Sequence, residues 1–368
     1  MADEVSGVLK MIGKGAGVLR DPARSLLRGP KDVFVPPDIV RKYRLAEGAS
    51  IEGTAKPGKQ GPRLQEVTSV CGMDPEAFRD RIPFAQLTAL DPDRRFNLAA
   101  SGDLSMRIVD LVAPIGKGTR GLIVSPPRAG KTTILEKLAQ AIRADSPETR
   151  IVALLVDERP EEVTHFKRAV DAEVLASSSD HDTKQHVELA ELTLAHVRVE
   201  LECGRDVVVL ADSLTRMGRA FNLIGRGQQG RTMSGGVDAG ALEVPRRFFG
   251  LARNAEEGGS VTIIATALID TGSKMDQLIV EEFKGTGNSE LLLDRSLADA
   301  DIWAAIDIAK SGTRKEQNLY SDEEYRRIVA IRRALAGARP QEAMKSLIAK
   351  VSKFETNEEF LENIPAAT

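Results

Sequence analysis

The chain has few of the residues on which disulfide-stabilised, zinc-binding or membrane-spanning proteins depend. Cys71 and Cys203 are the only two cysteines among 368 residues, and they lie far apart in sequence. They exclude a disulfide framework, and no C-x-x-C pair is present for zinc. No run of 18 apolar residues occurs, so the sequence predicts a cytoplasmic protein that does not contact a membrane.

Aromatic residues are also scarce, at 4%, and the net charge is only −3. This charge excludes a uniformly basic nucleic-acid-binding surface, although 51 Lys and Arg residues could still form a local basic channel. With 42% hydrophobic and 29% charged residues, the composition is that of a globular protein. The length indicates two or three domains.

Hydrophobic patterning divides the chain into four regions. Residues 1–90 contain short β-like stretches such as "AGVLR" and "LQEVTSV" between Gly- and Pro-rich turns, which predicts a small OB-type β-barrel. Residues 91–115 are expected to form a connector. In residues 116–320, continuous apolar strands alternate with helical segments, which predicts an α/β domain with a mostly parallel sheet. Residues 321–368 are expected to be helical.

The stretch "VSPPRAGKTTIL" (124–135) is similar to a phosphate-binding P-loop placed between a strand and a helix. Its opening glycine is replaced by Ser125, but Gly130, Lys131 and Thr132 satisfy the rest of the motif. Backbone N–H groups at a helix N-terminus bind phosphate, Lys131 can reach the terminal phosphates, and the Thr132 hydroxyl can bind Mg²⁺. The alternative is a Pro/Gly turn that contains Lys-Thr by chance. The residues expected to bind nucleotide here are Pro127, Arg128, Ala129, Gly130, Lys131, Thr132 and Thr133.

Two further strands end in carboxylates. "VVVLAD" ends in Asp212, a pattern typical of a Walker B strand that holds Mg²⁺. "VALLVDE" ends in Asp157 and Glu158, where a carboxylate could orient and deprotonate the attacking water. Each strand end alone could be merely solvated. Together with the loop, three such termini from one parallel sheet predict hydrolysis of a nucleoside triphosphate.

Long segments around these strands resemble bacterial transcription termination factor Rho. The resemblance runs nearly continuously over residues 107–320 and includes "LLVDERPEEVT", "ADSLTRMGRAFN" and "SGTRKE". A weaker resemblance over residues 5–90 is strongest in "LRGPKDVFVPPDIVRKYRL". The resemblance implies a homohexameric ring of RecA-like P-loop ATPase domains that binds ATP and Mg²⁺. Such a ring is a 5′-to-3′ translocase or helicase on single-stranded RNA and removes RNA polymerase from its elongation complex.

The resemblance implies a role for each residue of the catalytic set. Lys131 and Thr132 match the phosphate and Mg²⁺ ligands, and Asp212 matches the Walker B acid. Glu158 matches the catalytic base, and Arg216 matches an arginine that supports the γ-phosphate region. These five residues are therefore the expected centre of the hydrolysis reaction.

Further residues are implied at the edges of the nucleotide site. Arg159 matches an arginine that senses the subunit interface, and Arg314 matches an arginine finger that reaches the neighbouring subunit's site. Such a finger makes hydrolysis depend on ring assembly. Trp303 matches the aromatic residue against which adenine stacks, and because it is the only Trp its alternative is a place in the core. Asp301 replaces what is usually a basic residue, and no physical account of it follows from the sequence.

Two loops are implied to face RNA in the pore of the ring. The first, "GRGQQGRTMSGG" (225–236), is glycine-rich and basic, which suits the phosphate backbone of a single strand. The second is "EFKGTGNSE". A surface turn is the alternative for either loop. The residues assigned to RNA are Arg226, Arg231 and Thr232 in the first loop and Lys284, Gly285 and Thr286 in the second.

The expected barrel departs from the family pattern. Arg20 and Phe34 are expected to bind RNA, but Ala16 and Val18 stand where the family has stacking phenylalanines. Each stacked base contributes about 1–3 kcal/mol, so weaker RNA loading is expected. The preferred interpretation is an RNA-dependent ATPase that terminates transcription. The alternatives are a Rho-like regulatory or protein-binding paralogue and a subunit similar to those of hexameric rotary ATPases.

Overall fold

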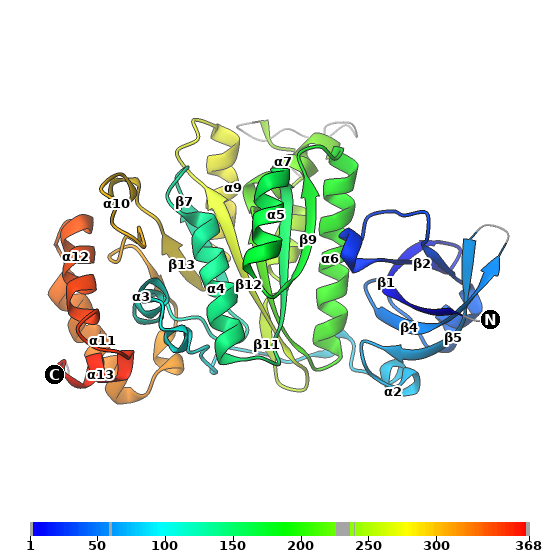
Figure 1. Ribbon diagram of the computed structural model, residues 1–368, viewed down its shortest axis with the longest axis horizontal. Helices are drawn as coiled ribbons and strands as arrows, with labels where there is room; N and C mark the ends of the chain where they lie inside the picture. Colours follow the sequence, from blue (N-terminus) through cyan, green and yellow to red (C-terminus); the bar gives the residue numbers. More distant parts are fainter. Residues whose placement is uncertain (1–2, 59–60, 226–235, 239, 366–368) are drawn as a thin grey trace.

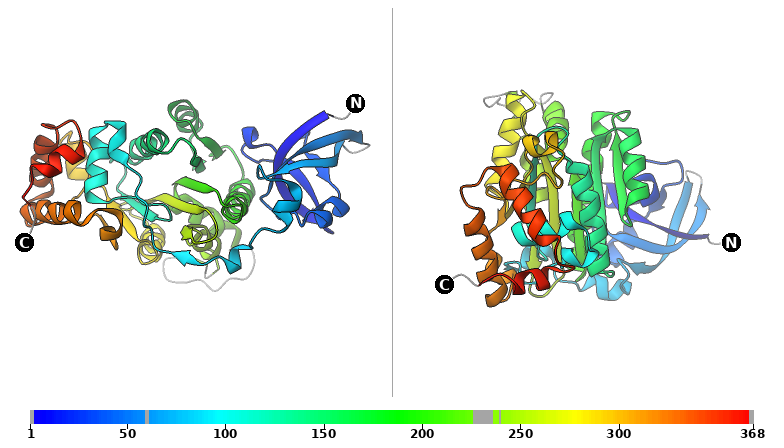
Figure 2. Two further views of the ribbon diagram at one scale, coloured as in Figure 1. Left: turned by 90° about the horizontal axis from the view of Figure 1, so that it is seen from below. Right: turned by 60° about the vertical axis from the view of Figure 1, so that its left-hand side comes forward.

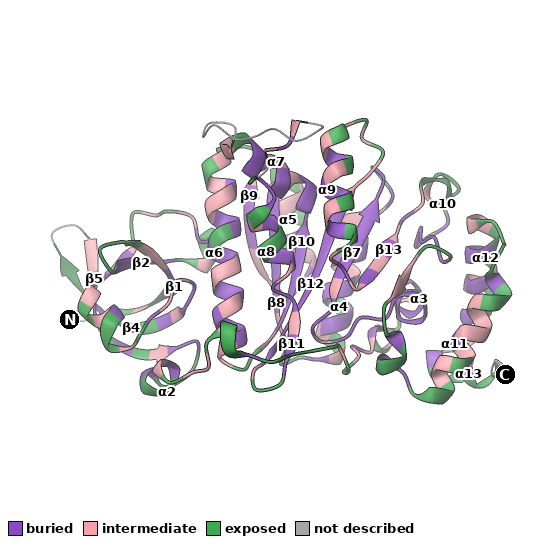
Figure 3. Cartoon of the chain, turned by 180° about the vertical axis from the view of Figure 1, so that it is seen from behind, coloured by how far each residue is buried: buried purple, intermediate pink, exposed green. Residues whose placement is uncertain are grey.

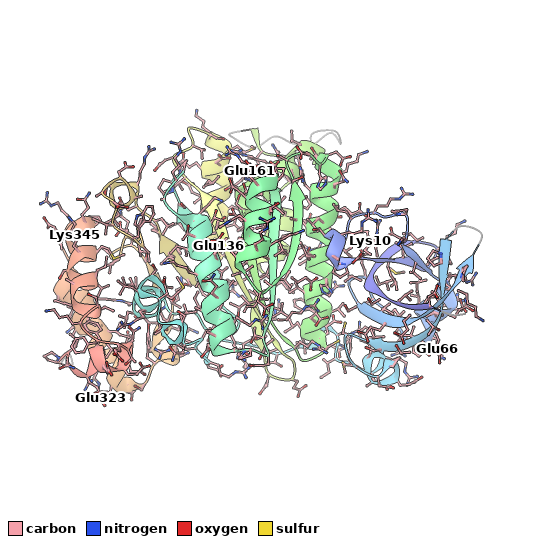
Figure 4. All side chains as sticks on the ribbon, in the orientation of Figure 1. Lys10, Glu66, Glu136, Glu161, Glu323 and Lys345 are labelled. Carbon is pink, nitrogen blue, oxygen red and sulfur yellow. The ribbon has the colours of Figure 1, made fainter. Side chains whose placement is uncertain are left out.

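The computed structural model describes residues 3–58, 61–225, 236–238 and 240–365 of the chain. A β-barrel lies at one end, a sheet flanked by helices forms the middle, and helices from the end of the chain lie at the other end (Figure 1). The view from below shows the same order, with the N-terminal barrel and the C-terminal helices on opposite sides of the sheet (Figure 2). The exposed side chains of Glu66 and Lys345 lie at the two opposite ends (Figure 4).

The barrel closes from five strands in the order β1-β2-β3-β5-β4. All neighbours are antiparallel except β3 and β5, which pair in parallel where Phe34 lies opposite Arg63. A closed small barrel leaves no unpaired sheet edge. The strands are β1 (Asp3–Gly13), β2 (Ala16–Arg20), β3 (Val33–Val35), β4 (Ser50–Gly58) and β5 (Gly61–Val70), with α1 (Pro37–Lys42) before β4 and α2 (Pro75–Arg79) after β5. The predicted OB-type barrel is confirmed.

The central sheet follows the order β14-β13-β7-β12-β10-β8-β9 and is parallel except at β14. Its inner strands are buried along nearly their whole length, which explains their continuous apolar sequences. Short antiparallel strands β11 (Arg253–Ala255) and β6 (Ala89–Leu90) extend the sheet beside β12. The seven main strands are β7 (Arg120–Ser125), β8 (Arg150–Glu158), β9 (Glu173–Ser178), β10 (Asp206–Asp212), β12 (Ser260–Leu268), β13 (Ser289–Leu292) and β14 (Gly312–Thr313).

Helices cover both faces of this sheet, and two apolar clusters fill the two layers. α4 (Lys131–Asp145) and α5 (Pro160–Ala169) pack on one face. α6 (Thr183–Glu202), α7 (Leu214–Gly225) and α9 (Lys274–Lys284) pack on the other. Seen from behind, the strands are mostly buried, whereas exposed residues follow the outer faces of the helices (Figure 3). The predicted α/β domain with a mostly parallel sheet is confirmed.

The last part of the chain is helical, as predicted. Its helices are α11 (Asp322–Leu335), α12 (Pro340–Val351) and α13 (Asn357–Glu362). Two short helices, α8 (Glu243–Phe249) and α10 (Arg295–Asp299), lie earlier in the chain. The C-terminal helices pack on α3 (Leu104–Val112), where Arg107 donates to the carbonyl oxygens of Phe354 at 2.7 Å and Thr356 at 2.8 Å. α3 lies inside the expected connector, residues 91–115, yet its apolar side chains are buried in the same cluster as those of α4.

The barrel is docked on α6, the helix nearest to it (Figure 1). The Nδ1 atom of His196 on α6 lies 2.7 Å from the carbonyl oxygen of Gly48. A Cβ atom on Gly48 would lie 2.2 Å from the backbone of Ala195, and its φ of +93° also requires glycine. Arg81 and Glu202 add an ion pair at 2.8 Å. The barrel therefore has a fixed position beside the sheet.

The two cysteines meet in this interface. Cys203, which follows α6, packs against the barrel cluster that contains Cys71, and both thiols are free. The side chain of Arg205 donates to the carbonyl oxygen of Cys71 at 2.7 and 3.1 Å. Interaction with the Cys203 thiol, together with burial, raises the pKa of Cys71. In the part of the chain that the structure describes, no helix has the length and apolar character needed to cross a membrane.

Candidate functional site

The loop after β7 lies beside the carboxyl ends of β8 and β10, at the end of the sheet where these parallel strands finish. Ser125 is fully buried at the end of β7, and its hydroxyl donates to the Pro126 carbonyl oxygen at 2.8 Å. Gly130 precedes α4 with a φ of +87°, and a Cβ atom there would lie 3.0 Å from the ring of Trp303. Glycine is thus required at 130, whereas the position of Ser125 needs only a small side chain.

Lys131 and Asp212 form the buried charge pair of the site. The Lys131 Nζ atom lies 2.7 Å and 2.6 Å from the two carboxylate oxygens of Asp212. The Thr266 hydroxyl on β12 also donates to Asp212, at 2.8 Å. Thr266 was not expected from the sequence. Its signal was a hydroxyl near the end of the mostly apolar run "SVTIIATAL", because a hydroxyl buried in a strand needs a hydrogen-bond partner.

A β-bulge directs Glu158 into the same site. The register between β8 and β9 shifts between Val156 and Glu158, and Asp157 adopts a φ of +55°. A bulge of this kind changes the face on which the next side chain lies. Glu158 is 2% exposed, its Oε1 atom accepts from Arg216 at 2.9 Å, and its Oε2 atom lies 3.8 Å from Lys131 Nζ. Among the described residues, Oε2 has no hydrogen-bond partner.

Burial, together with the nearby Asp212 carboxylate, raises the pKa of Glu158 to about 7. Lys131 and Arg216 act in the opposite direction, but they do not cancel the effect of burial. Arg216 is itself fixed by a hydrogen bond to the Asp157 carbonyl oxygen. A carboxylate with a pKa near neutrality in a pocket has the properties of a general base.

These groups open into one cavity of about 750 Å³, a size that suits a small organic ligand. The structure brings every residue expected to bind nucleotide to its wall. Arg159 lies at its exposed rim, just before α5, and Glu158 and Arg216 lie at its inner end. The predicted lining residues are Pro127, Arg128, Ala129, Gly130, Lys131, Thr132, Thr133, Arg159 and Trp303.

Trp303 is 48% exposed at the mouth of this cavity, so the alternative of a core tryptophan does not apply. Its indole Nε1 donates to the Asp301 carboxylate at 2.5 Å. Asp301 has a φ of +55°, which turns the chain sharply just before the ring. Asp301 thus has a physical role that the sequence left open, because it fixes the orientation of the indole.

Arg314 is the catalytic candidate that the structure places elsewhere. It is exposed beside β14, and its backbone N–H donates to the Asn288 carbonyl oxygen at 2.7 Å. It lines a shallow depression of about 290 Å³ with Lys310 and Arg332, and it is not among the residues lining the nucleotide cavity. Within one chain, Arg314 and Lys131 therefore belong to different surfaces.

The residues expected to face RNA from the second loop lie at the C-terminal end of α9 and directly after it. Lys284 and Gly285 are exposed, and the Thr286 carbonyl oxygen accepts from the Arg120 side chain at 3.0 Å. The backbone N–H of Arg120 also donates to the Asn288 side chain at 2.7 Å, so this turn is held at the start of β7. The residues expected in the first loop, Arg226, Arg231 and Thr232, lie outside the described residues.

The barrel carries a groove of about 990 Å³ on the side of β2 and β3. Val18, Arg20 and Phe34 line it, and the guanidinium of Arg63 lies 5.8 Å from the centre of the Phe34 ring. Ala16 is 7% exposed and does not line the groove. Of the two positions where aromatic residues were missing, only Val18 therefore faces the space in which a base could stack.

Comparison with family models also separates the barrel from the part of the chain that holds the nucleotide cavity. Residues 105–313 match the nucleotide-binding domain of the ATP synthase alpha/beta family. Residues 5–76 match the RNA-binding domain of the Rho termination factor. The first match contains the nucleotide cavity, and the second contains β1 to β5 and most of the groove.

Similar proteins extend over nearly the whole chain. Transcription termination factor Rho of Cereibacter sphaeroides is 47% identical over 365 residues, which cover 97% of this chain and 86% of the relative. The protein of the same name from Aquifex aeolicus is 47% identical and covers 98% and 85%. A solved ATPase from a type III secretion system of pathogenic bacteria aligns with a TM-score of 0.64, over 84% of this chain and 92% of that one. At 21% identity, that likeness concerns the fold alone, and it confirms the predicted RecA-like P-loop architecture.

Proposed function

The chain belongs to the family of Rho transcription termination factors, and from this premise we propose that it is an RNA-dependent ATPase that binds nascent RNA and terminates transcription. The observation that carries the proposal is that the Lys131 Nζ atom lies within 4 Å of both Glu158 and Asp212, at the carboxyl ends of β8 and β10. The same chain supplies an RNA-binding barrel docked on α6, which packs on that sheet. An ATPase and an RNA-binding surface in one rigid unit suit a motor that moves along RNA.

In this proposal the P-loop and Lys131 bind the terminal phosphates of ATP. Glu158 accepts the proton of the water that attacks the γ-phosphorus, and its raised pKa suits that transfer at neutral pH. Arg216 lies 2.9 Å from Glu158 and can stabilise the negative charge that develops on the γ-phosphate. The chemistry therefore consists of positioning and charge stabilisation, as expected for phosphoryl transfer.

Mg²⁺ is the metal that the donor set fits. The Asp212 carboxylate is buried at the end of β10, and Thr132, the second residue of α4, lines the nucleotide cavity. Both donors are hard oxygen atoms, which Mg²⁺ prefers. Asp212 and Thr132 would hold the ion, which when bound neutralises charge on the phosphate oxygens.

Arg314 supports a ring-shaped homohexamer. Because it lies outside the nucleotide cavity of its own chain, it can act as an arginine finger only in the cavity of a neighbouring copy. Arg159 lies at the exposed rim of the nucleotide cavity, where it could contact the copy that supplies the finger to that cavity. We therefore propose that hydrolysis requires ring assembly.

RNA would contact two places in such a ring. The groove offers Arg20 and Phe34 on the barrel. The pore would present Lys284, Gly285 and Thr286 together with the glycine-rich loop that contains Arg226 and Arg231. Movement of the pore residues with each hydrolysis step would translocate the strand 5′-to-3′ and displace RNA polymerase.

One observation favours a second candidate, a Rho-like regulatory paralogue with weak RNA loading. Phe34 is the one aromatic side chain among the described residues that line the groove, because Val18 occupies the second position. Since stacking on aromatic side chains contributes about 1–3 kcal/mol per base, this groove offers a single strong platform.

Transcription in vitro with a bacterial RNA polymerase tests the proposed function. The unaltered chain should produce shortened transcripts only when ATP is present, and Glu158→Gln should give full-length RNA. Glu161→Gln, the matched control, removes the same charge from the exposed first turn of α5 and should still shorten the transcripts (Figure 4). Full-length transcripts from the unaltered chain, despite active ATP hydrolysis, would favour the regulatory paralogue.

A further inference from the structure

The groove on the barrel is completed by a residue of the ATPase part. Glu188 lies on α6, which is packed on the central sheet, yet it lines the groove together with Val18, Arg20 and Phe34. α6 runs beside the barrel in both views (Figures 1 and 2). The composition of this groove therefore cannot be read from the barrel sequence alone.

Glu188 is directed at the most buried cation of the groove. The Arg20 side chain is only 7% exposed and lies between two carboxylates, with NH1 3.1 Å from Asp32 Oδ2 and NH2 3.2 Å from Glu188 Oε1. Within the described part of the chain, its one hydrogen bond is the bond to Glu188. The Nε and NH1 atoms of Arg20 are buried without a hydrogen-bond partner there. NH1 has the ion pair with Asp32, so NH2, which Glu188 occupies, is the donor that a ligand supplying oxygen atoms could take over.

The two carboxylates differ in how firmly they are held. Both Asp32 oxygens accept from the backbone N–H of Gly29 at 3.1 Å, and its side chain is 15% exposed. The Glu188 side chain is 36% exposed, and its contact with Arg20 is the one interaction it makes with the described residues. Asp32 is therefore a fixed part of the groove. Glu188 can turn into solvent from the surface of α6.

We propose that Glu188 is an internal competitor of RNA: its carboxylate occupies Arg20 until a phosphate of the single strand takes its place. The inference rests on the proposed RNA-binding function. Without Glu188, the groove has three cations, Arg20, Arg28 and Arg63, against one carboxylate, Asp32. Through Glu188, the ATPase part lowers the affinity of the barrel for RNA, so that a bound strand dissociates more readily.

Glu188→Gln tests this competition against a matched control on the same helix. Glu191→Gln removes the same charge one turn further along, from an exposed position outside the groove. In the full chain, Glu188→Gln should tighten binding of a fluorescent single-stranded RNA about threefold to tenfold at moderate salt. One additional phosphate contact should also steepen the slope of log K against log salt by about 0.7. Glu191→Gln should leave that slope unchanged.

A double-mutant cycle identifies Arg20 as the site of action. In a chain that carries Arg20→Gln, the change Glu188→Gln should no longer affect affinity or salt slope, because the competed group is gone. Equal effects of Glu188→Gln and Glu191→Gln would overturn the inference, since general charge would then explain both. A persistent effect without Arg20 would overturn it as well. If the unaltered chain binds no RNA at low salt, the proposed function fails together with the inference, whereas in the other two outcomes RNA binding stands.

Discussion

The nucleotide cavity and the barrel groove differ in how their charges are satisfied. In the cavity, Lys131 pairs with Asp212 and Arg216 pairs with Glu158, and both carboxylates are almost completely buried. In the groove, Arg20 lies between Asp32 and Glu188, whose side chain is 36% exposed, and the Nε atom of Arg20 has no partner among the described residues. The cavity is organised before its ligand arrives, whereas in the groove one partner of the buried cation, Glu188, is exposed enough to be displaced.

The difference follows from what each site does. A catalytic site lowers a barrier through groups that are already oriented, and it loses rate if they must reorganise during the reaction. A site that binds a strand in transit must release it, so a cation shared with an internal carboxylate is an advantage there. We therefore expect substitutions in the cavity to change rates by orders of magnitude, and substitutions in the groove to change affinities by smaller factors.

Arg314→Ala should have the largest effect and tests whether the cavity is complete within one chain. Loss of an arginine finger should lower the ATPase rate by about 10³- to 10⁵-fold and leave ATP binding intact. Lys310→Ala, at an exposed cation beside the same depression, should remain active. Mixing Arg314→Ala with inactive Lys131→Ala chains should restore hydrolysis, because one supplies an intact cavity and the other an intact finger. Mixtures that remain inactive would show that the finger does not act between copies.

The pH dependence of hydrolysis tests the raised pKa of Glu158. Because burial raises this pKa to about 7, Glu158 takes up a proton as the pH falls through 7 and can no longer accept one from water. The value of kcat/KM should fall about tenfold per unit below pH 7. The residual rate of Glu158→Gln is the control, since titration of ATP itself affects both proteins. A profile that stays flat down to pH 5 in the unaltered chain would contradict the assignment of Glu158 as the base.

Val18→Phe tests the weaker of the two sites. A phenyl ring beside Phe34 would offer a second stacking platform, because Val18 and Phe34 are paired across β2 and β3 on the groove. Binding of single-stranded RNA should tighten by about tenfold. Val18→Leu, which adds apolar volume without a π face, should bind like the unaltered chain. Equal gains from Phe and Leu would show that volume, and not stacking, limits binding.

Asp301→Ala should have the smallest effect and tests the hydrogen bond that orients Trp303. Loss of one hydrogen bond should raise the KM for ATP about threefold and leave kcat unchanged. Because Trp303 is the only tryptophan, its fluorescence reports this cavity directly, and ATP should change its emission less in the variant. Asp299→Ala, on the exposed end of α10, is the control. Identical fluorescence titrations of the three proteins would contradict the role of Asp301.

The cavity could largely be predicted because its residues follow strand ends. A P-loop, a Walker B strand and a third acidic strand end meet once the sheet is parallel, so Lys131 and Asp212 were named from local motifs. The third strand end left Asp157 and Glu158 open, and the family resemblance selected Glu158. The register shift that turns Glu158 inward was not predictable, because it depends on pairing between β8 and β9. Thr266 was missed for a similar reason, since its acceptor, Asp212, lies on a strand that is adjacent only in the folded sheet.

The groove was less predictable because it is assembled across the barrel–helix interface. Arg20 and Phe34 could be named from the barrel sequence, but Glu188 lies 168 positions after Arg20 and belongs to a helix of the other domain. Asp301 presents the same problem at short range: its role depends on a turn conformation, which the sequence does not reveal. The barrel and the α/β sheet themselves were predictable from strand spacing and burial pattern. The contacts between them were not.

The central claim, that hydrolysis of ATP by this chain depends on RNA, is tested most directly by the ATPase rate with and without RNA. The rate should be measured with poly(C), poly(U) and mixed-sequence RNA over a wide concentration range. We predict that RNA raises the rate and that half-maximal stimulation shifts to lower RNA concentration in Glu188→Gln. Hydrolysis that stays at its basal rate with every RNA at every concentration would contradict the account.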